Sequence, residues 1–138
     1  MEKTAVTYFL NIGASRSHVN LPEVTEGEVW NAFRLADLCP DYLFGPIFIG
    51  HEQGGENTFI LQMDVRPTPE QMGILCGALD QQAIALACVP LSPSDDYRAA
   101  IALWGELHGP KAAEWGPFNA DYFRLPGGLL LQSAQASA

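Results

Sequence analysis

Apolar and polar positions along the chain recur with a period of two over residues 5–12 and 82–89, and each of these stretches predicts a β-strand. A buried helix is the alternative for the alanine-rich run 82–89. Residues 43–49 and 58–65 are rich in aromatic and β-branched side chains, and they flank a polar stretch that contains glycine. This arrangement predicts that the second and third strands form a hairpin.

Two helices are predicted by capping boxes, in which a threonine is followed three residues later by Glu or Gln. Thr25 with Glu28 begins a helix over residues 26–38, which Cys39-Pro40 ends. Thr68 with Gln71 begins the other helix. The expected buried faces carry Val29, Phe33 and Ala36 in the first helix and Met72, Leu75, Cys76 and Leu79 in the second.

A third helix is predicted in the part of the chain after residue 93. Tyr97, Ile101 and Trp104 stand at i, i+4 and i+7, which predicts this helix over residues 94–108 with Ser94 as its cap. Residues 110–130 are aromatic and turn-rich, and we expect them to be irregular. Residues 131–138 are predicted to be a loose tail.

The order strand, helix, strand, strand, helix, strand over residues 4–89 predicts an α+β fold. We expect a ferredoxin-like βαββαβ unit, that is, an antiparallel sheet with two helices on one face. The predicted C-terminal helix and the aromatic-rich extension follow it. At 138 residues the chain has the length of one domain, so we expect residues 1–138 to form a single domain.

Composition excludes several classes of protein. Hydrophobic residues make up 48% of the chain, which favours a packed globule over disorder. No apolar run approaches the roughly 20 residues that span a bilayer, and no secretion signal is recognisable, so we expect a cytoplasmic protein. Sixteen acidic against seven basic residues give a net charge of −9, which disfavours direct binding of nucleic acid. Three cysteines without a CxxC pair are interpreted as buried structural thiols.

The predicted topology brings three polar loops to one end of the sheet, because the strands alternate in direction. They are residues 13–20, 50–57 and 80–82. Arg16, the serine hydroxyls and the amide groups near the start of the first helix are groups that bind phosphate or carboxylate. The candidate ligand-binding residues are Ser15, Arg16, Ser17, His18, Asn20, His51, Asn57 and Gln82.

Four aromatic rings lie within nine residues of the C-terminal extension, at Trp115, Phe118, Tyr122 and Phe123. An exposed patch of this size is unfavourable, so the rings must cover something. In one interpretation they pack on the sheet face opposite the helices, together with Phe9 and Trp104. In the other they form an interface with a partner or a second copy, where aromatic residues are enriched.

The absence of a recognisable catalytic motif favours a non-enzymatic binding module, expected to be a homo-oligomer without cofactor or metal. Its ligand would be a small anionic or nucleotide-like molecule at the loop-lined end. The alternative is an acidic inhibitor that blocks a basic protein surface; phage-encoded inhibitors of host defence are similar to this chain in size and charge only. A second alternative is a small hydrolase that uses His18 or His51 as a base.

Overall fold

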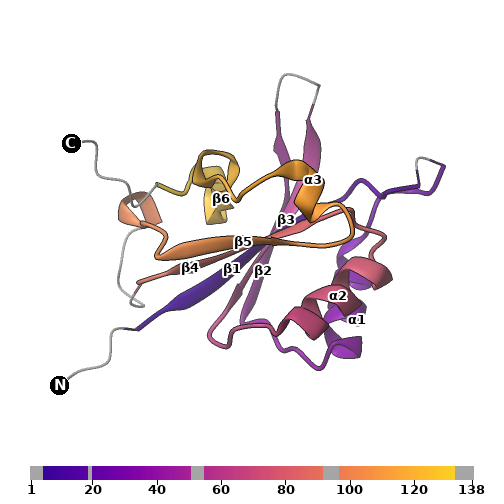
Figure 1. Ribbon diagram of the computed structural model, residues 1–138, viewed down its shortest axis with the longest axis horizontal. Coiled ribbons are helices and arrows are strands. Elements are labelled where there is room, and N and C mark those ends of the chain that lie inside the picture. The colour runs from indigo at the N-terminus through magenta and orange to yellow at the C-terminus, as the bar shows by residue number, and fades with distance from the viewer. Residues whose placement is uncertain (1–4, 19, 51–54, 92–96, 133–138) are drawn as a thin grey trace.

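The computed structural model describes the whole chain except residues 1–4, 19, 51–54, 92–96 and 133–138. It is an α+β structure whose five-stranded antiparallel sheet has the order β2-β3-β1-β4-β5 (Figure 1). The strands are β1 (Thr7–Gly13), β2 (Tyr42–Ile49), β3 (Glu56–Met63), β4 (Ile84–Val89) and β5 (Trp104–His108). The first four correspond to the four strands that the sequence predicts.

Strand β1 is the middle of the sheet and is buried on both faces. Leu10 pairs with Leu61 of β3 on one side and with Leu86 of β4 on the other. Because side chains alternate along a strand, Leu10 faces one layer of the molecule and Phe9 faces the other. Both side chains are fully buried, so the sheet needs a cover on each face.

Two helices, α1 (Glu26–Leu35) and α2 (Pro69–Ala78), form the first cover, on one side of the sheet (Figure 1). Both predicted capping boxes are present. The Thr25 hydroxyl accepts from the Glu28 N–H at 3.2 Å, and the Glu28 carboxylate accepts from the Thr25 N–H at 3.1 Å. All the residues predicted for the buried faces are buried. Helix α1 ends earlier than predicted, because Asp37 adopts a left-handed backbone with φ 57°.

The C-terminal part of the chain forms the second cover, on the opposite face. Phe123, Leu125 and Leu131 pack there against Phe9 and Ile60. The segment consists of short elements: η1 (Tyr97–Ala99), α3 (Ala112–Trp115), η2 (Ala120–Tyr122), β6 (Arg124–Leu125), η3 (Pro126–Gly128) and β7 (Leu129–Leu130).

The prediction of a third helix over residues 94–108 is wrong. Residues 104–108 instead form β5, which pairs with the free edge of β4, and 92–96, including the expected cap Ser94, lie outside the described residues. Trp104, Glu106 and His108 share one face of this strand, and Gly105 in its middle is a poor helix former. The helical spacing of Tyr97, Ile101 and Trp104 was therefore misleading. Pairing with β5 satisfies the row of backbone groups along the edge of β4, which a helix over residues 94–108 would leave unpaired.

Two further expectations about the C-terminal part need correction. Trp104 does not join Phe9 but lies on the helix side of the sheet, where its ring is 6.1 Å from that of Tyr8. The tail is not loose from residue 131, since Leu131 is buried and Gln132 forms a parallel bridge with Ile101. Residues 133–138 lie outside the described part of the chain.

Gly105 leaves room for the ring of Phe118 in the second cover. A Cβ atom at Gly105 would lie 2.2 Å from that ring. We expect Gly105→Ala to lower the free energy of unfolding by about 1–3 kcal/mol, the usual cost of overpacking. Gly73→Ala is the matched control in α2, because its Cβ would meet nothing within 4 Å. It should raise the free energy by about 0.5–1 kcal/mol. Urea unfolding measures both, and equal effects would contradict this packing.

Candidate functional site

The loop between β1 and α1 is joined to the other two segments that the sequence places at this end. The Ala14 N–H donates to the Asn57 carbonyl at 2.8 Å, which attaches the loop to the start of β3. The Ser17 N–H donates to the Asp80 carbonyl at 2.7 Å, which attaches it to the turn after α2. The predicted convergence of these segments is therefore present among the described residues.

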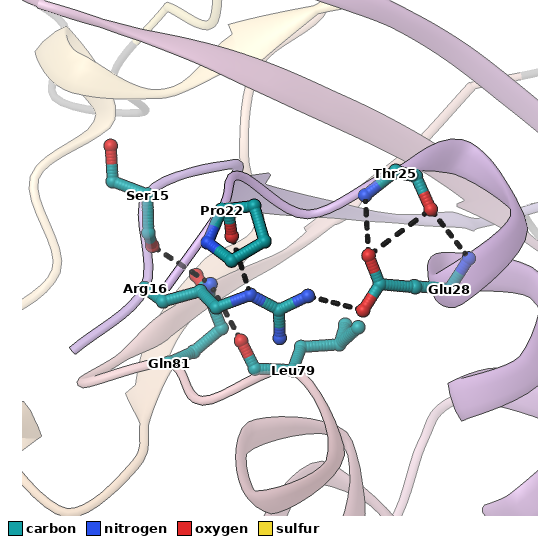
Figure 2. Close-up of polar contacts among 7 residues, drawn as sticks. All are labelled: Ser15, Arg16, Pro22, Thr25, Glu28, Leu79 and Gln81. Atoms are coloured by element: carbon teal, nitrogen blue, oxygen red, sulfur yellow. Dashed lines mark hydrogen bonds and ion pairs between the residues drawn. The ribbon is translucent and has the colours of Figure 1, made fainter. Parts of the chain in front are cut away.

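Arg16, the cation expected to hold an anion, is engaged within the chain. Its guanidinium donates to the Pro22 carbonyl at 2.8 Å and to the Glu28 carboxylate, and Figure 2 shows it pointing at both groups. Only 10% of its side chain is exposed. Two hydrogen bonds lower the pKa of the Glu28 carboxyl group. The bond from Arg16 has the larger effect, and the bond from the Thr25 N–H has the next largest. Glu28 thus supplies the negative charge that an anionic ligand would bring to this helix start.

The turn after α2 carries Gln81, which is 5% exposed and whose importance the sequence did not indicate. Its amide donates to the Ser15 carbonyl at 3.1 Å and to the Leu79 carbonyl at 3.2 Å (Figure 2). A buried glutamine needs such partners because an unpaired amide costs free energy. The Ser15 carbonyl is 66 positions away, and only the approach of two loops distant in sequence provides it, so no local pattern could have identified this contact.

Glu56 holds the beginning of the same loop. Its carboxylate accepts from the Ser15 N–H at 3.3 Å and lies over Gly13, where a Cβ atom would be only 2.5 Å from a carboxylate oxygen. A glycine at this position therefore allows the carboxylate to approach the backbone. The backbone N–H groups of Ser15 and His18, two of the candidate ligand-binding residues, both donate to carboxylates of the chain itself.

His18 and Asp80 form a pair. The Asp80 Oδ2 atom is 2.7 Å from His18 Nδ1 and accepts the His18 backbone N–H at 3.0 Å. A carboxylate only accepts, so a neutral His18 carries its proton on Nδ1 and has an unprotonated Nε2. The hydrogen bonds from His18 lower the pKa of Asp80. The imidazole is 76% exposed, and an oriented histidine of this kind can act as a general base.

A hollow of about 420 Å³ lies beside this pair, between α2, the 13–22 loop and the end of β5. Its polar lining comes from Ser17, Cys76, Asp80, Gln81 and His108. His108 Nε2 is 2.7 Å from a Glu106 carboxylate oxygen. The Cys76 thiol donates to the His108 carbonyl at 3.4 Å, and burial raises the pKa of this thiol to about 11. Cys76 is thus a neutral thiol at pH 7 rather than a nucleophilic thiolate.

The remaining predicted ligand-binding residues are placed less closely together. Asn20 lines a second, shallower hollow that also includes Ser17 and His18. The Asn57 side chain donates to Glu23 at 3.3 Å. Gln82 is exposed, and its carbonyl accepts from the Lys111 N–H at 2.9 Å. His51 lies outside the described residues.

The four aromatic residues of the C-terminal segment divide between core and surface. Phe123 is 1% exposed, and the half-buried Phe118 packs beside it with ring centroids 5.6 Å apart. These two belong to the second cover, and Phe123 has almost no surface to offer a partner. Trp115 and Tyr122 are 56% and 76% exposed. They remain available for an interface.

The cysteines are partly as predicted, and no metal centre appears among the residues that the structure describes. Cys76 and Cys88 are buried, but Cys39 is exposed, because it follows the left-handed turn that ends α1 and lies outside the helix layer. Within the described residues no three His, Cys, Asp or Glu side chains come together to hold a metal ion.

Carboxylates dominate the charge at the loop-lined end. The acidic residues that the loop contacts or that begin α1 are Glu23, Glu26, Glu28, Glu56 and Asp80. Among the described residues of this end, the basic side chains of Arg16 and Lys111 each have a carboxylate partner, which is Glu28 for Arg16 and Glu114, at 3.6 Å, for Lys111. The outward charge of this end is therefore negative.

No family model, curated protein or solved structure matches this chain. None of the helices among the described residues is long and apolar enough to cross a membrane. The site is therefore interpreted from its own geometry.

The Asp80 pair makes a contribution to stability that depends on pH. Because the folded-state pKa of Asp80 lies below its ordinary value of 3.8, the contribution is complete well above pH 3.8 and is lost as the pH falls through the folded pKa. We expect Asp80→Asn to lower the free energy of unfolding at pH 7 and to lower it progressively less as the pH falls below 3.8. Chemical denaturation at a series of pH values measures this. A difference independent of pH would contradict the role of the carboxylate charge.

Proposed function

We propose that the chain is a non-enzymatic binding protein whose loop-lined end docks on a basic surface of a partner protein. The observation that supports this most is the state of Arg16, which is nearly buried and bonded to Glu28. The cation that an anionic ligand would need is neutralised within the chain, whereas several carboxylates remain at the surface around it. Complementary charge of this kind accelerates association with a basic partner and gives it specificity.

The same geometry supports the inhibitory version of this function. An acidic end that covers a basic surface would block whatever that surface binds, and the loop is held at several points by hydrogen bonds. A loop already ordered loses little conformational entropy when it binds. The similarity of size and charge to phage-encoded inhibitors is consistent with this version of the proposal.

The exposed rings of Trp115 and Tyr122 support a further part of the proposal, an interface with a second copy or with the partner. Large exposed aromatic side chains are typical of such interfaces.

The same proposal includes a ferredoxin-like arrangement for β1 to β4 with α1 and α2. The order β2-β3-β1-β4 and the position of both helices on one face support it, with β5 as an additional edge strand.

A histidine-dependent hydrolase has less support. His18 is oriented by Asp80, but within the described residues no hydroxyl or thiol group is hydrogen-bonded to its ring. An activated nucleophile normally lies within hydrogen-bond reach of its base. The hydrolase therefore stays a prediction from the sequence.

Reversal of charge at the loop-lined end tests the proposed function. A labelled hexa-arginine peptide is the probe, and Glu23→Lys with Glu26→Lys is the variant. Since electrostatic steering acts on association, we expect the association rate constant at low salt to fall about tenfold and to depend less on salt. Stopped-flow fluorescence measures the rate.

The matched control is Asp64→Lys with Glu70→Lys. It changes the net charge equally, and Glu70 lies in the first turn of α2 as Glu26 lies in that of α1. The control should retain most of the rate. Equal losses in the two double variants would show that only the total charge matters and would overturn a specific acidic end.

The anionic-ligand version makes a different prediction. It requires the ligand to displace Glu28 from Arg16, so phosphate or a nucleotide should raise the melting temperature of the wild type, and Arg16→Ala should abolish that rise. From the contacts of Arg16 we expect no rise with inorganic phosphate or ATP up to millimolar concentration. A rise that disappears in Arg16→Ala, as measured by differential scanning fluorimetry, would replace the basic partner by an anionic ligand.

A further inference from the structure

The backbone of α2 forms part of the wall of the hollow beside this helix, at two glycine residues. Gly73 and Gly77 line it one turn apart, and a Cβ atom at either position would meet nothing within 4 Å. Pro69 and Pro110 also line the hollow. Glycine backbone and proline rings form a surface on which an aliphatic chain can lie, as the methylene stem of Lys or Arg does on apolar protein surfaces.

One carboxylate supplies the charge of this hollow. Asp80 Oδ2 accepts both hydrogen bonds from His18, whereas Oδ1 accepts none among the described residues. The pKa of Asp80 is lowered, so the group is ionised at neutral pH. Among the described residues neither Lys nor Arg lines the hollow, and the other titratable groups of this lining are the neutral Cys76 thiol and His108, which faces Glu106. The charge of the lining is complementary to a cation.

We propose that this hollow accepts one basic side chain, arginine or lysine, from the partner protein. The stem of that side chain lies along Gly73 and Gly77, and its charged head donates to Asp80 Oδ1. This inference rests on the proposed function and makes it more specific, because Ser17 and Asp80 of the loop-lined end line the hollow, which gives docking a fixed point. A side chain held in a pocket at the margin of a charged surface is how an interface gains register as well as attraction.

Short peptides with a single charge are the probes. Acetyl-Gly-Gly-Arg-Gly-Gly-amide, its lysine counterpart and its citrulline counterpart are titrated into the full chain, and amide chemical shifts are followed by NMR. Citrulline has nearly the shape of arginine but no charge. We expect the arginine or the lysine peptide to shift the amides of Gly73, Gly77 and Asp80, and the citrulline peptide to bind at least tenfold more weakly. Equal binding of citrulline, or shifts confined to other regions, would overturn the proposal.

Gly77→Leu fills the hollow with a side chain that the helix tolerates. The matched control is Gly27→Leu in α1, where a Cβ atom also meets nothing within 4 Å. Both changes replace a helical glycine by a better helix former, so both variants should fold. We expect Gly77→Leu to weaken binding of the charged peptide at least tenfold and Gly27→Leu to leave it unchanged. Equal affinities in the two variants would exclude the hollow as the site.

Asp80→Asn separates charge from shape, because asparagine tolerates the left-handed backbone found at Asp80 with φ 50°. In this variant the preference for arginine over citrulline should disappear. A preference that persists would show that Asp80 does not supply the charge.

Failure of this inference and failure of the proposed function give different results. If hexa-arginine binding is sensitive to Glu23 and Glu26 but not to Gly77→Leu, the acidic end stands and the hollow does not. In the opposite case the single-arginine peptide shifts the amides of Gly73 and Gly77, and the association rate of hexa-arginine is the same for the wild type and the charge-reversed variant. That result would support the hollow as a binding site and overturn the wider acidic surface.

Discussion

The burial of β1 on both faces is the constraint on which the rest of the structure depends. Leu10 and Phe9 are adjacent in sequence, point to opposite sides and are both fully buried. A sheet with two apolar faces must be covered twice, because exposed apolar surface of this area is unfavourable in water. The two helices supply one cover, and the C-terminal segment is held to the other face by Asn11. Its side chain donates to the Arg124 carbonyl at 2.9 Å and accepts from the Arg124 N–H at 2.8 Å.

This double cover leaves the polar chemistry of the molecule at the ends of the strands. Where β1 ends at Gly13, the chain enters a loop whose backbone N–H groups donate to Glu56, Asp80 and the Asn57 carbonyl. The loop is therefore ordered by acidic groups of its own chain. The bond of Arg16 to Glu28 neutralises the cation of the loop and leaves this end negative, so the stability of the loop and the proposed binding preference both depend on contacts with carboxylates.

The hollow beside α2 shows how a functional feature can arise from positions that do little for the core. Gly73 and Gly77 are unfavourable in the interior of a helix compared with alanine. They lie on the open face of α2, while Leu75 and Cys76 of the same helix are buried against the sheet. One side of helix α2 thus packs against the sheet, and the side with Gly73 and Gly77 lines the hollow. An open helix surface next to an ionised carboxylate is the physical basis of the proposed basic-side-chain site.

The sequence by itself determined the first four strands, both capping boxes and the buried faces of α1 and α2, because these depend on spacing within a few residues. It did not determine β5, whose strand form depends on pairing with β4 rather than on local preference. It also nominated Arg16 as an anion-binding group, because charge and loop position can be read from sequence. Only the tertiary structure, by placing Glu28 beside Arg16 and Asp80 beside His18, decided which charges are neutralised and which face outward. Such pairings join residues up to 62 positions apart, and no local pattern encodes them.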